Sequence, residues 1–162
     1  MSRKHSEQKV VVDFLSRLEA LYTDVTSWVA DRTLNVSSSF VELHEETLGR
    51  YEVPCLSIQK AGGEEIGMLN PVGATVIGAS GRVDLVGAVD REILVFLDKG
   101  GPTISRTIQD SGQAKTQTVP LYRGVSEDGW YWIESRKPSR ARLLDKTLFL
   151  DLLDEVSDYE SR

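Results

Sequence analysis

A long amphipathic stripe near the N-terminus places the strongest constraint on what this chain can fold into. Between residues 7 and 32, apolar side chains recur at steps of three and four positions. This spacing puts them on one face of an α-helix of about seven turns. We therefore expect a helix over about 7–32 whose apolar face must be covered. The stripe consists of Val11, Phe14, Leu18, Leu21, Val25 and Trp28.

The sequence leaves two ways to cover this face. The stripe can pack against a sheet of the same chain. Because its steps average 3.5 residues, it can also form the seam of a coiled coil with a partner helix, and three heptads are the minimum for that interpretation. The six stripe residues are therefore also candidate partner-binding residues, for another protein or for a second copy of this chain.

The middle of the chain carries short apolar runs separated by turn-forming residues such as Gly62-Gly63 and Asp128-Gly129. Most of the connections are too short to hold a crossover helix, so the expected sheet is mainly antiparallel, a meander or a partly closed barrel. The predicted strands are 40–47, 51–59, 65–69, 75–77, 82–86, 93–98 and 130–134.

Two further segments complete the expected fold. Residues 103–121 are rich in Ser, Thr and Gln, which indicates a polar hairpin or a flexible loop suited to recognition. Asp145 is a candidate N-cap for a second amphipathic helix over about 145–159. The prediction is one α+β domain, 1–162, with a β region over about 40–135 between the two helices.

Composition limits the compartment and the partners. The chain has 162 residues, the length of one ordinary domain. Its single cysteine, Cys55, has no internal partner, and no leader-like segment opens the chain, so we expect a reducing, cytoplasmic compartment. No apolar run approaches the ~18 residues that a membrane helix needs. The net charge of -6 disfavours broad attraction to nucleic acid or anionic lipid, although a local basic patch can still act.

One stretch, GRVDLVGAVDREILVFLDKG, raises the question of a nuclease site. Asp84 in GRVDL and Lys99 in FLDK resemble part of the PD-(D/E)xK superfamily of nucleases. That superfamily places an aspartate on one strand and, on the next strand, an acid and a lysine with one apolar residue between them. Here Leu97 stands where the second acid belongs, and strand alternation turns Asp98 to the other face. The resemblance implies at most a degenerate or inactive nuclease site.

The simpler interpretation of the same stretch is structural. Residues 82–86 and 93–98 read as the two strands of a β-hairpin, joined by a turn around residues 87–90. In that hairpin Arg82 and Asp84 share one face, which we expect to be exposed.

Two other residue sets were candidates for chemistry. Glu42, His44 and Glu46 follow strand spacing and could converge on a metal ion, but no second cluster completes the coordination, so a solvated strand face is expected and no metal or other cofactor is predicted. Cys55 lies in an apolar run, which indicates a buried and unreactive thiol.

An aromatic and basic segment offers a nucleic-acid site. Trp130, Tyr131 and Trp132 precede a basic stretch, and rings beside cations can stack bases and hold phosphates. Alternatively, the tryptophans fill the core from one strand face, Tyr131 lies on the other, and the basic residues solvate a linker. The candidate nucleic-acid-binding residues are Arg136, Lys137, Arg140 and Arg142.

Because each candidate catalytic set lacks a member, we predict no enzymatic activity. We expect an interaction protein, an accessory subunit, adaptor or inhibitor of a macromolecular partner, most readily another protein. A nucleic-acid-binding protein or a degenerate PD-(D/E)xK-like nuclease is the alternative. A sheet closed around a small-molecule cavity is a third possibility that the sequence leaves open.

Overall fold

A computed structural model describes residues 2–134 and 140–158 of the chain. Within these residues two helices enclose a series of strands in chain order. The elements are α1 (Arg3–Ala30), β1 (Asn35–Glu45), β2 (Gly49–Gln59), β3 (Glu65–Gly73), β4 (Arg82–Val86), β5 (Arg91–Leu97), β6 (Thr103–Asp110), β7 (Gln113–Pro120), β8 (Gly129–Ile133), β9 (Ala141–Leu143) and α2 (Lys146–Ser157).

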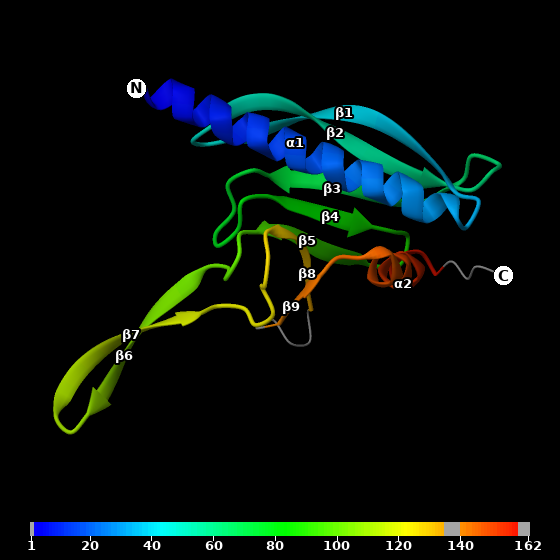
Figure 1. Cartoon of the computed structure of the whole chain (residues 1–162). Helices are drawn as coiled ribbons and strands as arrows, with labels where there is room; N and C mark the ends of the chain where they lie inside the picture. The colour runs from blue at the N-terminus through cyan, green and yellow to red at the C-terminus, as the bar shows by residue number, and fades with distance from the viewer. Residues whose placement is uncertain (1, 135–139, 159–162) are drawn as a thin grey trace.

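Seven of the strands form one antiparallel sheet in the order β1-β2-β3-β4-β5-β8-β9, and β6 and β7 form a separate two-stranded ribbon (Figure 1). Strands that follow one another along the chain are neighbours in the main sheet. The only insertion is the β6–β7 ribbon, between β5 and β8. The predicted α+β class with a mainly antiparallel sheet is confirmed. The sheet is an open meander and not a closed barrel, because β1 and β9 stand at opposite ends of the strand order.

Helix α1 lies over one face of this sheet, along the direction of the strands (Figure 1), and buries most of the predicted stripe. Phe14, Leu18 and Val25 are fully buried, and Leu21 is nearly so, in the same core as strand residues such as Leu85. The predicted helix is confirmed, with a start four residues earlier. Its apolar face is covered by the sheet of its own chain.

The two ends of the stripe are less enclosed. Val11 is partly exposed, and Trp28 packs against Phe149 of α2 with ring centroids 5.7 Å apart. An ion pair between Arg32 and Asp154, 2.6 Å long, joins the same two regions. Both helices therefore belong to one layer on one side of the sheet.

Helix α2 is fixed at both ends. Its predicted N-cap is confirmed, because the side chain of Asp145 accepts a hydrogen bond from the backbone N–H of Leu148 at 2.8 Å. At the other end, the carbonyl of Val156 accepts hydrogen bonds from Val89 and Asp90 in the turn between β4 and β5. Neither helix of the described chain is long and apolar enough to cross a membrane.

Two strand predictions are corrected by the structure, and one further strand was not predicted. Residues 75–77 form no strand, and only an isolated bridge between Val76 and Ala79 occurs there. Strand β9 was missed, because its three residues follow a basic segment that reads as a linker. Strand β1 begins at Asn35, five residues early, because pairing with β2 extends through serines that have little strand preference of their own.

Gly87 tests how closely α2 lies on the β4–β5 turn. A Cβ atom at this position would stand 2.2 Å from the carbonyl oxygen of Val156, so a Gly87→Ala substitution must push helix and turn apart. We expect a loss of about 3 kcal/mol in the free energy of unfolding, the upper end for an overpacked site. Urea denaturation measures it. Gly62→Ala is the control, because a Cβ there meets nothing within 4 Å, and equal losses in the two variants would contradict the packing.

Candidate interaction surfaces

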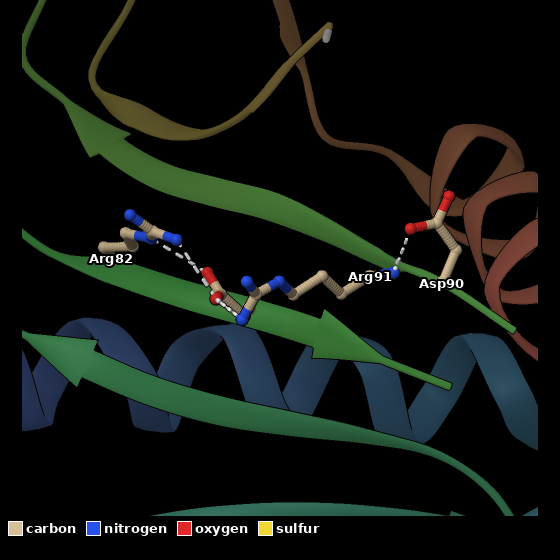
Figure 2. A network of polar contacts seen from close by, with 4 residues as sticks. Arg82, Asp90 and Arg91 are labelled. Atoms are coloured by element: carbon tan, nitrogen blue, oxygen red, sulfur yellow. Dashed lines mark hydrogen bonds and ion pairs between the residues drawn. The ribbon is translucent and has the colours of Figure 1, made fainter. Parts of the chain in front are cut away.

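The aspartate of the nuclease-like stretch, Asp84, forms ion pairs with Arg82 of β4 and Arg91 of β5, the two arginines labelled in Figure 2. Asp84 is only 4% exposed, and Arg82 donates to its carboxylate from Nε at 2.9 Å and from Nη2 at 3.1 Å. Arg91 approaches from β5, with Nη1 4.0 Å from Oδ2 of Asp84. The expectation that Asp84 is exposed is wrong, because the two arginines flank it in the middle of the sheet.

The hydrogen bonds from Arg82 have a chemical consequence. They raise the pKa of the Arg82 guanidinium, against the opposing effect of burial. Both oxygens of Asp84 accept hydrogen bonds from this one arginine. The carboxylate is thus engaged in holding the sheet together.

Lys99 does not join this cluster. The β4–β5 register pairs Asp84 with Ile93, six residues before Lys99, which corresponds to about 20 Å along a strand. Lys99 follows the end of β5, where its backbone N–H donates to Asp128. The two residues that carry the resemblance to nucleases therefore lie apart.

The metal candidates are also dispersed. Glu46 lies in the turn after β1 and not on the strand, while Glu42 faces Arg50 at 3.9 Å. Among the described residues, no group of three or more His, Cys, Asp or Glu could hold a metal ion. Cys55 is buried as expected, and burial raises the pKa of its thiol.

A carboxylate that the sequence did not single out organises one end of the sheet. Glu45, at the end of β1, accepts hydrogen bonds from the backbone N–H groups of Ala74 and Thr75 at 3.0 and 2.9 Å, from the Thr75 hydroxyl at 2.6 Å, and from the Tyr51 hydroxyl. Burial opposes ionisation, but these hydrogen bonds outweigh it and lower the pKa of Glu45. The side chain thereby ties the β3–β4 connection to the β1–β2 hairpin.

The aromatic residues of the basic segment serve the core. Trp130 and Trp132 pack on the α1 side of the sheet, where their indole N–H groups donate to the carbonyl of Arg17 at 3.1 Å and to Glu92 at 2.8 Å. Tyr131 is buried on the opposite face in a second, smaller cluster. This arrangement is the core alternative expected from the sequence.

The arginines of this segment are only partly described. The guanidinium of Arg142 lies 5.8 Å from the ring centre of Trp132, and Arg140 is exposed. Arg136 and Lys137 lie outside the described residues. Nucleic-acid binding by this segment stays a prediction.

The most exposed part of the described chain is the ribbon of β6 and β7, which we call the arm (residues 103–120). It projects from the body of the molecule (Figure 1), and of its sixteen strand residues only Val119 is even partly buried. Ser111 and Gly112 join the strands with φ angles of 52° and 80°, as a type I′ turn requires. Of the two expected structures for this segment, the arm is the polar hairpin.

The register gives the arm two different faces. Ile104 pairs with Val119, and Ile108 pairs with Lys115, so these side chains share one face with Arg106. We call this the apolar-basic face; Gln113 and Gln117 also lie on it, and Asp110 stands at its tip. The opposite face is rich in hydroxyl groups. It carries Thr103, Ser105, Thr107, Gln109, Ala114, Thr116, Thr118 and Pro120.

The base of the arm is narrow. The N–H of Leu121 donates to the carbonyl of Pro102 at 2.8 Å, so the two residues that flank the arm are hydrogen-bonded to each other. The arm therefore leaves and re-enters the body at one point.

A groove of about 540 Å³ runs between α1 and the β1–β2 hairpin. Its apolar lining comes from Leu15 and Tyr22 of α1 and from Phe40, Pro54 and Leu56 of the hairpin. Phe40 is 70% exposed, an unusual state for a large aromatic side chain. The polar lining consists of Glu19, Thr23, Thr26 and Ser38.

This groove could not be predicted from the sequence. The stripe that faces the core runs along a different side of α1 from the residues that line the groove. No pattern in the strand serines marks Phe40 as exposed. Only the packing of helix against hairpin creates the surface.

Comparisons with known proteins identify no relative. No family model, no curated protein and no solved structure matches this chain. The function must therefore be argued from the surfaces of the chain itself.

The Asp84 cluster generates a stability prediction. Asp84→Ala leaves the part-buried guanidinium of Arg82 without its acceptor, and we expect a loss of about 1.5–3 kcal/mol in the free energy of unfolding. Arg91→Ala removes a more exposed and more distant partner and should cost less than about 1 kcal/mol. Urea denaturation of both variants checks the order, and an Asp84→Ala variant as stable as the parent would show that the pair is dispensable.

Glu45 generates a pH prediction. Its folded pKa lies below the ordinary glutamate value, so its stabilising contribution is fully present above about pH 5 and is lost as pH falls through the folded pKa. Glu45→Gln should therefore lower stability by roughly 1 kcal/mol at neutral pH and progressively less in acid. Thermal unfolding across pH measures the difference. Glu46→Gln, one residue away in the exposed turn, is the control, and a pH-independent difference for Glu45→Gln would oppose this assignment.

Proposed function

We propose that this chain is a non-enzymatic, cytoplasmic interaction protein that binds a macromolecular partner through its arm, as an accessory subunit, adaptor or inhibitor. One observation carries the proposal: an ordered β-ribbon whose strands are exposed from base to tip. The partner class that we favour is protein.

The physics of a two-stranded ribbon supports this proposal. An isolated hairpin is at best marginally stable in water, because it buries little apolar surface against the entropy of ordering its backbone. A partner that covers the apolar-basic face would supply the missing burial. Both outer edges of the ribbon also carry backbone donors and acceptors that can pair with a strand of another protein.

The state of the reactive groups supports a role without catalysis. The carboxylate of Asp84 is held by Arg82, and that of Glu45 is held by the β3–β4 connection. The buried thiol of Cys55 has a raised pKa, which disfavours the reactive thiolate. In the described chain these groups are engaged in structure.

The α1 stripe no longer serves as the main candidate surface. Four of its six residues, Phe14, Leu18, Leu21 and Val25, are within the core. Partner binding by the stripe stays an untested prediction, and only Val11 and Trp28 of the stripe are partly exposed. The arm takes its place because its apolar side chains are already accessible, with Ile104 45% and Ile108 41% exposed.

Removal of the arm tests the proposal. Residues 103–120 are replaced by Asn-Gly, which suits a tight turn between the hydrogen-bonded Pro102 and Leu121. We expect the shortened chain to keep its thermal unfolding midpoint within a few degrees, because the arm adds almost nothing to the core. It should lose the stoichiometric protein partner that the full chain retains in affinity purification, scored by mass spectrometry.

The same purification scores the other partner class. Nucleic acid that co-purifies with the full chain and is released by high salt would favour the nucleic-acid alternative. A protein partner retained equally by the full and shortened chains would show that the arm is not the binding element.

A further inference from the structure

We infer that the partner of the arm is a second copy of this chain, whose groove between α1 and the β1–β2 hairpin receives the apolar-basic face. This inference rests on the proposed function of the arm as the binding element, and it names the surface that the arm binds. Four features of the described residues support it: matching apolar surfaces, opposite charge, separation within one chain and free strand edges.

The apolar parts match in kind. The arm offers Ile104, Ile108 and Val119 on one face, two of them more than 40% exposed. The groove offers an apolar floor with the exposed ring of Phe40 at its side. Burial of such apolar side chains against a complementary surface removes them from water and stabilises the complex.

The charges are opposite. The arm carries Arg106, Lys115 and Asp110, a charge of +1, whereas the whole chain carries -6, so the remainder carries -7. The groove itself is lined by Glu19. This difference orients the arm toward the body of another copy despite the overall repulsion between two acidic chains.

The strand next to the groove adds further acidic charge. Glu42 and Glu52 pair across β1 and β2, one alternation beyond Phe40 and Pro54, so they continue the same face. Arg50 offsets one of the carboxylates through its 3.9 Å contact with Glu42. A net negative rim therefore remains for Arg106 and Lys115 to meet.

One chain cannot fill its own groove with its own arm. The arm leaves the sheet after β5, three strand positions from β2, a displacement of about 14 Å. It points away from the side of the molecule where α1 and the β1–β2 hairpin lie (Figure 1). An arm of eight-residue strands, about 26 Å long, can instead reach the groove of a neighbouring molecule.

Free strand edges supply the backbone part of the contact. Strand β1 stands at the end of the strand order, and no described strand pairs with its outer edge. Its eleven residues exceed the eight of either arm strand. An arm strand paired at this edge would extend the sheet and place the apolar-basic face beside Phe40 at the groove.

The test measures the mass of the full chain over a concentration series by sedimentation or light scattering. We expect a concentration-dependent dimer if the exchange is reciprocal, or longer assemblies if it does not close. Ile108→Glu places a carboxylate on the apolar-basic face and should weaken self-association at least about tenfold. Thr107→Glu adds the same charge to the hydroxyl face and is the matched control.

A second pair of variants tests the groove. Phe40→Glu should weaken association as strongly as Ile108→Glu, whereas Ser39→Glu, on the other face of β1, should not. All four positions are exposed, so each variant should keep its fold, which thermal unfolding confirms. A mixture of the Ile108→Glu and Phe40→Glu chains restores one intact arm and one intact groove, and we expect a heterodimer from the mixture alone.

The outcomes separate this inference from the proposed function. A chain that stays monomeric at all concentrations, or equal effects of the test and control variants, overturns the inference. If such a monomer still captures a different protein through its arm, the proposed function stands. If arm removal changes neither self-association nor capture of any partner, both are overturned.

Discussion

The burial of the α1 stripe against the sheet is the contact on which the rest of the molecule depends. A fully buried Leu or Phe side chain contributes about 1.5–3 kcal/mol, and α1 buries Phe14, Leu18 and Leu21 along one side of the helix. An open antiparallel sheet covers neither of its faces by itself. The helix therefore covers one face of the sheet, and its buried side chains share one core with those of the strands.

The placement of α1 also determines the remaining surfaces. Helix α2 joins the same layer through Trp28 and Phe149 and through the pair of Arg32 and Asp154. Toward β1 and β2 the helix does not close on the hairpin, and the groove follows from that incomplete contact. The same packing thus creates the stable interior and an open, largely apolar groove beside it.

Periodicity predicted the parts of the fold that repeat a pattern over many residues. The α1 stripe, the hairpin of β4 and β5 and the Asp145 N-cap all have local signals, and they were found. Strand β9 has three residues, too few for alternation to be visible. The burial of Asp84 could not be read from β4 alone, because one of the arginines that flank it comes from the next strand.

The polar sites show a second limit of sequence reasoning. The role of Glu45 depends on hydrogen bonds from backbone N–H groups about thirty positions away. Backbone donors are present in almost every residue type, so the sequence does not mark them. The exposure of Phe40 likewise depends on where a helix stops covering a hairpin. Such features arise from tertiary packing, so only the folded chain reveals them.

The body and the arm differ in how their polar and apolar groups are paired or exposed. Among the described residues, no buried side-chain nitrogen or oxygen lacks a hydrogen-bond partner. The arm instead exposes apolar side chains and two unpaired strand edges to water. The buried polar side chains of the body therefore have hydrogen-bond partners within the chain. In the arm, apolar side chains and strand edges face water.

The point of attachment of the arm has a consequence for how such a chain can diversify. Strand β5 pairs directly with β8, so the sheet is continuous across the insertion, and Pro102 and Leu121 close its base. Changes of length or composition between these two residues leave the register of every sheet strand untouched. Selection can therefore alter the arm at a rate independent of the selection that preserves the sheet.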